Sequence, residues 1–339
     1  MSHRIDVLCV GDIVTEPFIK LLPQEAEIDK DPRDKHPLLC MTYGSKIPFE
    51  SMTVIEGVGN SANAAVSLAR LGLKSSLMAN IGDDDVGRGM LVALRKNDVQ
   101  TQYMKVNRGK ASNYHFVLWY EPDRTILIKH ENYDYTWPRI PEEDTPKWIY
   151  LSSFAESGAH MHADIAEYLI KHPEVKLAFQ PGTFQMRLGF AKLKQLYAHT
   201  EVFAVNVEEA QMMTKKQGER NIRVLAEAIH AHGPKIVVIT DGPNGSYASD
   251  GSQVLAMRNY PDPKPPYERT GAGDAYTSTF VAGLITTGDI REAMKWGPVN
   301  SMSVVQEIGG QAGLLSRAKL NKLLAQAPHD YEPHEYKPD

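Results

Sequence analysis

The sequence predicts a three-layer α/β/α fold, in which helices cover both faces of a mostly parallel central sheet, with a small β-sheet lid. Three observations indicate this fold. Short apolar runs alternate with amphipathic segments, polar and glycine residues collect where the apolar runs end, and two segments of strand-like character interrupt the alternation. A succession of strand, helix and strand is typical of parallel sheets buried between helices.

The apolar runs are candidate strands, and they lie at residues 5–10, 76–79, 148–151, 175–179, 201–205 and 236–240. The candidate helices between them lie at residues 62–71, 86–96, 164–171 and 222–230. Their apolar residues recur at helical spacing, as Ala62, Ala65 and Val66 do. We therefore expect a single domain over residues 1–339 whose large core is built from these alternating units.

Polar or glycine residues follow the candidate strands. They are Gly11-Asp12, Gly82-Asp83-Asp84, Ser152-Ser153, Gln180-Pro181-Gly182, Asn206 and Asp241-Gly242. In an open parallel sheet the carboxyl ends of the strands lie along one edge, and ligands bind at that edge. One such residue alone usually only turns the chain, so the motifs that coincide with these positions carry the functional interpretation.

Residues from about 16 to 55 and from about 101 to 135 depart from the alternation. The second segment has apolar side chains on both faces of a candidate strand, with Tyr114, Phe116, Leu118 and Tyr120 on one face and Val117 and Trp119 on the other. Because a sheet that is apolar on both faces must be covered on both, we expect a lid. One face would close over substrate, and the other would meet a second subunit in a homodimer. The tail at 327–339 is rich in proline and charge, and we expect it to be loosely packed.

Composition excludes several classes of protein. The formal net charge is -5, which offers nucleic acid no attractive field. The chain has 2 cysteines, which suits a reducing compartment, and no apolar stretch approaches the roughly 20 residues that span a bilayer. The first residues contain no signal-peptide pattern. We expect a cytoplasmic protein that acts on a small molecule.

The sharpest motif is Thr270-Gly271-Ala272-Gly273-Asp274, which leads into a helical segment lined with small residues. Glycines at a helix start let backbone N–H groups approach an anion at the positive end of the helix dipole. A carboxylate in the first turn lies at the same place. Phosphoryl transfer needs both parts, donors for the phosphate oxygens and a base for the attacking alcohol. Alone, these five residues are also an ordinary helix entry.

A second glycine motif occurs at residues 57–65. Gly59 allows a ligand to lie against the backbone, and Asn63 offers donors and an acceptor to sugar hydroxyls. The same stretch also fits the looser dinucleotide fingerprint GxGxxA, with Asp83 as a ribose-binding acid about 20 residues further on. An NAD(P)-dependent dehydrogenase is therefore the enzymatic alternative, although it leaves the motif at Asp274 and the lid without a role.

Two weaker signals follow later strands. Asn206 ends an apolar run, and Glu209 lies three residues on, where a carboxylate can hold the waters of Mg²⁺. Thr240, Gly242 and Gly245 form a turn that brings backbone to the sheet edge. Alone, the first signal is also typical of acids that complement the dipole of a first helical turn, and the second predicts only a loop.

Taken together in their order, these motifs resemble the ribokinase-like (PfkB) family of sugar and nucleoside kinases along nearly the whole chain. The resemblance implies ATP as phosphoryl donor, Mg²⁺ as cofactor and Asp274 as catalytic base beside the amides of Gly271, Ala272 and Gly273. It implies substrate contacts from Gly59 and Asn63, nucleotide contacts from Asn206, Thr240, Gly242, Gly245 and Asn300, and a metal contact from Glu209. To the substrate site we also assign Asp12, Glu16, Tyr114 and Lys129. Arg124 and Lys129 (or Lys46) are candidates for binding a carboxylate or phosphate, although charges on exposed strands more often protect a sheet edge.

The sequence departs from the family pattern at three places. Val58-Gly59 replaces a glycine pair, Glu16 replaces an early aspartate, and Glu268-Arg269 replaces the usual Asp-Thr. The first two changes leave the acceptor open between a sugar, a nucleoside, a keto-acid sugar and a sugar phosphate. The third leaves a monovalent-cation site open. We predict an ATP-dependent sugar kinase; a non-catalytic sugar- or nucleotide-binding regulator is the alternative outside enzymes.

Overall fold

The computed structural model describes residues 5–30, 37–120 and 123–338. Within these residues, nine strands form one central sheet in the order β17-β16-β15-β14-β13-β12-β11-β1-β6. The strands are β1 (Val7–Val10), β6 (Ser75–Met78), β11 (Trp148–Leu151), β12 (Lys176–Phe179), β13 (Thr200–Asn206), β14 (Ile236–Thr240), β15 (Ser246–Ser249), β16 (Val254–Met257) and β17 (His334–Glu335). The six strands from β6 to β14 are parallel, and β15, β16 and β17 are added antiparallel. The six strands expected from the sequence are all present.

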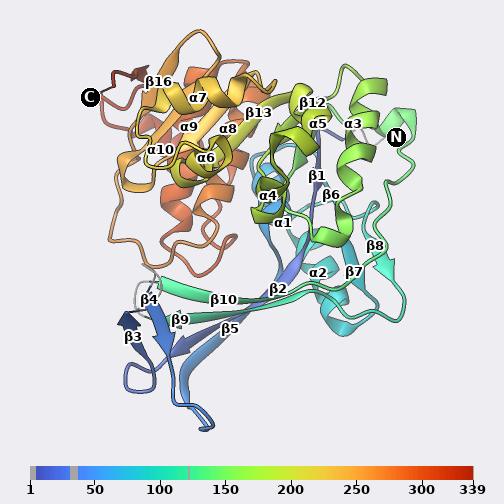
Figure 1. Ribbon diagram of the computed structural model, residues 1–339, viewed down its shortest axis with the longest axis vertical. Helices are drawn as coiled ribbons and strands as arrows, with labels where there is room; N and C mark the ends of the chain where they lie inside the picture. Colours follow the sequence, from blue (N-terminus) through green and yellow to red (C-terminus); the bar gives the residue numbers. More distant parts are fainter. Residues whose placement is uncertain (1–4, 31–36, 121–122, 339) are drawn as a thin grey trace.

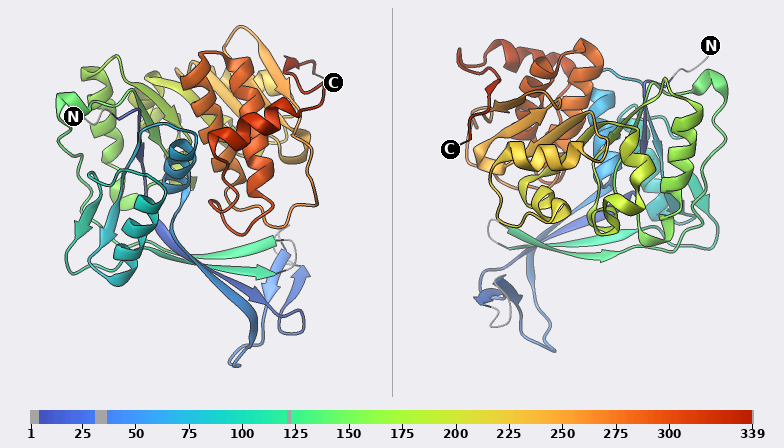
Figure 2. Two further views of the ribbon diagram at one scale, coloured as in Figure 1. Left: turned by 180° about the vertical axis from the view of Figure 1, so that it is seen from behind. Right: turned by 45° about the horizontal axis from the view of Figure 1, so that its top comes forward.

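Two helical layers cover this sheet (Figure 2). One layer holds α1 (Asn60–Arg70), α2 (Asp85–Lys96), α8 (Ala272–Thr287), α9 (Ile290–Val304) and α10 (Arg317–Ala325). The other holds α3 (Met161–Lys171), α4 (Thr183–Lys192), α5 (Lys194–Ala198), α6 (Val207–Thr214) and α7 (Ile222–His230). Short 3₁₀ turns occur at Glu142–Asp144, Glu156–Gly158 and Gly242–Asn244. The prediction of a three-layer α/β/α fold is confirmed.

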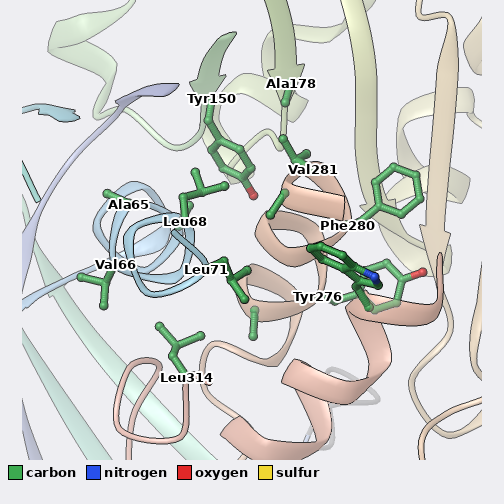
Figure 3. Close-up of a cluster of buried hydrophobic side chains, with 14 of the residues drawn as sticks. Ala65, Val66, Leu68, Leu71, Tyr150, Ala178, Tyr276, Phe280, Val281 and Leu314 are labelled. Carbon is green, nitrogen blue, oxygen red and sulfur yellow. The ribbon is translucent and has the colours of Figure 1, made fainter. Parts of the chain in front are cut away.

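Each layer buries its own apolar cluster against the sheet. In the layer of α1 and α8, Leu68 and Val281 gather beside Tyr150 and Ala178 of the sheet (Figure 3). Burial of an aliphatic or aromatic side chain of this size contributes about 1.5–3 kcal/mol. Gly283 of α8 lets α9 approach closely, since a Cβ there would lie 2.8 Å from the Cα of Ala293. These contacts hold the start of α8 at the sheet edge.

A second sheet of four strands crosses the carboxyl edge of the central sheet (Figure 1). Its order is β10-β9-β2-β5, with β2 at Val14–Leu21, β5 at Phe49–Val58, β9 at Tyr114–Tyr120 and β10 at Asp123–Lys129. We call it the lid sheet. Val117 and Trp119 are buried on its inner face, whereas Phe116 on the other face is exposed. The alternation expected from the sequence is therefore present.

Two smaller sheets complete the described part of the chain. Strands β3 (Glu27–Lys30) and β4 (Pro37–Cys40) form a hairpin at the far end of the lid sheet (Figure 1). Strands β7 (Asn80–Gly82) and β8 (Lys105–Asn107) pair beside the core. The second predicted lid segment, 101–135, thus also includes β8, which belongs to neither the lid sheet nor the central sheet, and extends past the lid to Tyr133 and Tyr135, which are buried in the core. Residues 31–36 and 121–122 of the predicted lid lie outside the described residues.

The expectation of a loosely packed tail does not hold for residues 327–338. Tyr331 is 2% exposed and donates a hydrogen bond to the carbonyl of Lys295. Strand β17 pairs with β16. Burial of the Tyr331 ring, with its hydroxyl hydrogen-bonded, stabilises a packed tail despite the prolines and charges. The prediction from composition was therefore wrong. Residue 339 lies outside the described residues.

Candidate active site

A cavity of about 450 Å³ lies between the lid sheet and the carboxyl edge of the central sheet. We call it the edge cavity. Asp12 follows β1, Ser153 follows β11, and Gln180 follows β12, so three neighbouring strands deliver polar residues to it. The chain leaves β1 for β6 on one side and returns as β11 on the other, and such a switch point opens a crevice in a parallel sheet. The cavity is large enough for a small sugar.

Three carboxamides hold the carboxylate of Asp274 in the edge cavity. Oδ1 accepts from Asn60 Nδ2 at 2.8 Å and from Gln180 Nε2 at 3.1 Å, and Oδ2 accepts from Asn63 Nδ2 at 2.9 Å. We call this set the carboxamide clamp. Behind it, Gln311 Nε2 donates to Asn63 Oδ1 at 3.1 Å. The clamp fixes the orientation of the carboxylate without placing a positive charge against it.

The electrostatic surroundings of Asp274 suit a base. Burial raises its pKa above the ordinary aspartate value, whereas hydrogen bonds from Asn63, Asn60 and Gln180 lower it and the charge of Glu16 raises it; the net direction is upward. A raised pKa means that the carboxylate holds a proton more strongly than an exposed aspartate does. General bases benefit from such a shift when the proton comes from a weakly acidic hydroxyl.

The first turn of α8 begins directly beside this carboxylate. Gly271 caps the helix with φ 77, a left-handed conformation that glycine adopts readily. A Cβ at Gly271 would lie 2.4 Å from the Cα of Gly310, so a larger residue would not fit. Gly273 lines the edge cavity next to Asp274. The N–H groups of a first helical turn have no partner within the helix and attract anions, which suits a phosphate at this end of the cavity.

At the other end of the cavity, Asp12 and Glu16 face His115 of β9 and His130, which directly follows β10. Asp12 accepts from the Tyr135 hydroxyl at 2.6 Å and from the Ala155 N–H at 2.6 Å. His130 Nδ1 lies 3.3 Å from Asp12, and His115 Nδ1 lies 3.6 Å from Glu16. Each carboxylate of this end of the cavity therefore lies beside one imidazole. Such a surface provides acceptors and donors for several hydroxyl groups.

Asn206 and Glu209 both line the edge cavity and cap α6 reciprocally. The Glu209 N–H donates to Asn206 Oδ1 at 2.8 Å, and the Asn206 N–H donates to Glu209 Oε2 at 2.9 Å. Burial raises the pKa of Glu209, the Asn206 N–H lowers it, and Asp274 and Glu208 raise it further. A cation between Glu209 and Asp274 would relieve this repulsion. Among the described residues no group of three or more His, Cys, Asp or Glu forms a metal cage.

A second cavity of about 380 Å³ lies behind the turn after β14 and beside α9. We call it the loop cavity. Gly242 and Pro243 form one wall, and Pro298 and Met302 of α9 form another. Arg269 lines both cavities, and Ala272 of α8 lies at their junction. An apolar slot joined in this way to an anion-binding helix start suits a purine base with its phosphates.

The chain matches the family described as pfkB family carbohydrate kinase over residues 43–317. It belongs to the pfkB family of carbohydrate kinases. Among curated relatives, it is 28% identical over 293 residues to 5-dehydro-2-deoxygluconokinase of Bacillus licheniformis, covering 81% of this chain and 89% of the relative. It is 26% identical over 286 residues to ribokinase of Bacillus subtilis, covering 83% and 92%. The prediction of an ATP-dependent kinase for small sugar-like substrates is confirmed.

Solved structures agree with this carbohydrate kinase in fold. Arabidopsis thaliana ribokinase complexed with ribose and ATP has a TM-score of 0.76 and 18% identity, covering 95% of this chain and 99% of that one. The Methanocaldococcus jannaschii nucleoside kinase has a TM-score of 0.73 and 16% identity, with coverage of 95% and 99%. Both similarities concern the fold alone.

The dinucleotide interpretation of residues 57–65 does not fit the kinase. Helix α1 follows β5 of the lid sheet, whereas a dinucleotide fingerprint requires a strand of the parallel sheet before the helix. Asp83, the candidate ribose acid, accepts from the Gly109 N–H at 3.0 Å. Asp84 caps α2. These acids stabilise a turn and a helix start.

Most predicted site residues of the kinase lie together. The residues that line the edge cavity are Asp12, Glu16, Gly59, Asn63, Asn206, Glu209, Thr240, Gly271, Gly273 and Asp274, together with Arg124. Gly242 and Ala272 line the loop cavity. Glycine-bearing helix starts that are far apart in the sequence therefore meet across one cavity, as the sequence predicted.

Four predicted residues lie elsewhere. Asn300 is fully buried and bonds to Thr279 Oγ1 at 2.7 Å and to the Leu315 N–H at 2.9 Å, so it lines neither cavity. Gly245, with φ 96, makes the β14–β15 turn against Met257. Tyr114 and Lys129 are outside both cavities because they alternate with the inward-facing histidines.

Sequence reasoning missed several residues of the site. Asn60 and Gln180 complete the carboxamide clamp, and His115 and His130 face the acceptor end. Both amides could have been found from the sequence, because Asn60 lies inside the glycine motif and Gln180 directly follows a predicted strand. The inward position of the histidines follows from strand alternation once the inner face is known.

Proposed function

We propose that this kinase transfers the γ-phosphoryl group of ATP to a hydroxyl of a small sugar held under the lid sheet, with Asp274 as the general base. The observation that carries the proposal is the juxtaposition of the clamped Asp274 carboxylate and the first turn of α8 in one cavity. In-line transfer requires a base for the acceptor hydroxyl and a phosphate site in the same cavity, and this cavity has both.

The acceptor hydroxyl oxygen bonds to the γ-phosphorus while the bond from that phosphorus to the β-phosphate oxygen breaks, and ADP leaves. Asp274 takes the hydroxyl proton, and the amides of Gly271, Ala272 and Gly273 stabilise the charge on the moving phosphoryl group. Asp12, Glu16 and Asn63 orient the acceptor. The lid sheet excludes water that would otherwise hydrolyse ATP.

The nucleotide would occupy the region between Thr240, Gly242 and Asn206, with its base in the loop cavity. Glu209 fits a role in holding Mg²⁺ through water, because its carboxylate lies in the edge cavity near that of Asp274. When bound, Mg²⁺ would neutralise phosphate charge. A monovalent cation has little role in this proposal, because the carboxylate of Glu268 already accepts hydrogen bonds from Thr270 and Gly309.

A keto-acid sugar is the first acceptor to test. Several curated relatives bear the name 5-dehydro-2-deoxygluconokinase, and His115 and His130 in the edge cavity suit a carboxylate on the substrate. A free pentose is the second acceptor, because Asp12 and Glu16 suit neutral hydroxyls and another relative is named ribokinase. Nucleosides and sugar phosphates complete a panel for ADP release at fixed Mg-ATP.

Replacement of Asp274 by asparagine tests the assigned base. We expect Asp274→Asn to lower kcat by roughly 10²–10⁴ because asparagine cannot take the proton, while its similar shape keeps the fold. The measurement is coupled ADP release with the best acceptor, alongside thermal unfolding of both proteins. Turnover equal to wild type in a folded variant would contradict the role. Absence of ADP release by wild type with all four acceptor classes would favour a non-catalytic regulator.

We also propose a cytoplasmic homodimer formed through the outer face of the lid sheet. Met52 and Val54 of β5, Phe116 of β9 and Leu127 of β10 are exposed on this face. A continuous apolar sheet face is unfavourable in water, and a two-fold axis would cover it with the same face of a second copy. Among the described residues, no helix is both long and apolar enough to span a membrane.

A further inference from the structure

Glu268 is a buried acid that the proposed transfer does not use directly. It is 3% exposed and lies two residues before Thr270, at the entry to α8. Its Oε1 accepts from the Thr270 N–H at 2.7 Å and from the Thr270 hydroxyl at 2.6 Å. Its Oε2 accepts from the Gly309 N–H at 3.2 Å. One carboxylate therefore fixes the turn that leads into the phosphate-binding amides.

The neighbouring loop at Gly309 and Gly310 ties this carboxylate to the rest of the site. A Cβ at Gly309 would lie 2.4 Å from Ile55 of the lid sheet, and a Cβ at Gly310 would lie 2.5 Å from Asn63 of the clamp. Gly310 also lies against Gly271. A shift of Glu268 would therefore reach both the first turn of α8 and the side chain that holds Asp274.

The lid sheet contacts this carboxylate through a cation. Arg124 Nε of β10 lies 3.5 Å from Glu268 Oε1, and within the described chain it is the sole cationic side chain in ion-pair range of Glu268. The adjacent residues also touch, because the rings of Trp119 and Tyr267 meet edge to face at 5.1 Å. The Arg124 side chain is about one quarter exposed, whereas that of Glu268 is 3% exposed, so the ion pair lies at the boundary between the lid sheet and the buried turn.

We infer that Arg124 and Glu268 form a latch that couples closure of the lid sheet to correct placement of the phosphate-binding turn at the start of α8. A buried carboxylate without a counter-charge is unfavourable, so the turn around Glu268 is most stable when Arg124 is present. Both are positioning residues. The inference rests on the proposed kinase function, since it concerns the same anion site, and it is tested only on a wild-type protein with measured transfer activity.

The experiment compares Arg124→Met, Glu268→Gln and the double variant in a thermodynamic cycle on kcat, with the acceptor that wild type phosphorylates. Each single change should lower kcat on the order of 10-fold to 100-fold while the KM for ATP changes less than about threefold. The double variant should be no worse than the poorer single variant, because both changes break the same contact. Arg124→Lys keeps a cation and should recover part of the loss.

Two further measurements separate the latch from a structural defect. ADP release without acceptor, relative to transfer, should rise in Arg124→Met because an unlatched lid sheet admits water. Lys129→Met is the matched control, since Lys129 lies on the same strand but its side chain is 73% exposed and pairs with Glu131 at 2.6 Å. Its kcat should equal that of wild type. Independent, multiplying losses in the double variant, or unchanged kcat in Arg124→Met, would overturn the latch while leaving the kinase function intact.

Discussion

At the scale of single residues, Asp274 is held by the neutral amides of the carboxamide clamp, not by a cationic side chain. Arginine or lysine beside Asp274 would lower its pKa strongly and weaken it as a base. Neutral amides orient the carboxylate yet leave its pKa above the ordinary value, because burial outweighs their hydrogen bonds. The clamp thus combines a fixed direction with retained basicity.

The clamp predicts the effect of Asn60→Leu on the pH profile. Asn60 stabilises the ionised form of Asp274, so its loss should raise the pKa of Asp274 further. Since the base acts when ionised, the acidic limb of kcat should move to higher pH, with kcat about 3–10-fold lower below neutral pH and closer to wild type above it. The measurement is kcat between pH 5 and 9.

Asn97→Leu serves as the control for that profile. Asn97 bonds to Arg70 and to the Ala93 carbonyl, away from the edge cavity. An acidic limb that stays in place in Asn60→Leu, or moves equally in the control, would argue against a role for the clamp in tuning Asp274.

At the scale of elements, Asn300 joins three helices and a loop. From α9 it donates to Thr279 of α8, lies 3.5 Å from Ser67 Oγ of α1, and accepts from the Leu315 N–H before α10. A buried amide that meets all these groups is costly to replace, because its partners are left without hydrogen bonds. These contacts give Asn300 a structural role that requires no contact with nucleotide.

We expect Asn300→Leu to lower the free energy of unfolding by about 1–3 kcal/mol, through the unsatisfied Leu315 N–H and the lost hydrogen bond to Thr279. The KM for ATP should remain near wild type, because Asn300 lines neither cavity. Urea unfolding and ATP titration measure the two effects. A stable variant with a greatly raised KM for ATP would restore the adenine-pocket role that the sequence resemblance suggested.

Much of the element scale could be predicted from sequence. The strands at 148–151 and 236–240 were placed correctly because each is a short apolar run bounded by polar residues. Helix α9 was missed because Pro298 interrupts its pattern, although the fold tolerates this proline inside the helix. The reciprocal capping by Asn206 and Glu209 was not predicted, because the sequence indicated only an acidic first helical turn there.

The site could be predicted only where one short motif carried it. The glycines of residues 270–274 and 59–63 identified these two stretches as parts of the site. The latch, in contrast, joins Arg124 to Glu268, which lies far along the chain. Such pairs depend on strand register and on which face turns inward, and a one-residue change of register reverses every side chain. Tyr114 and Lys129 were misplaced for this reason.

At the scale of the whole molecule, the outer face of the lid sheet predicts the oligomeric state. Phe116→Glu combined with Val54→Glu would place like charges in an apolar interface, so we expect the dimer to dissociate at micromolar concentration. Sedimentation velocity measures the change. Thr286→Lys on the exposed end of α8 is the control, and it should remain dimeric. A wild-type monomer at 50 micromolar would contradict the proposed interface.

The carboxamide clamp also has a consequence for how the molecule matures. Its bonds to Asp274 span 214, 211 and 94 residues of sequence, from Asn60, Asn63 and Gln180. Closing loops of this length costs conformational entropy, so we expect the base to be assembled late, after the sheet and both helical layers have come together. In a refolding experiment, turnover should therefore return later than helix content.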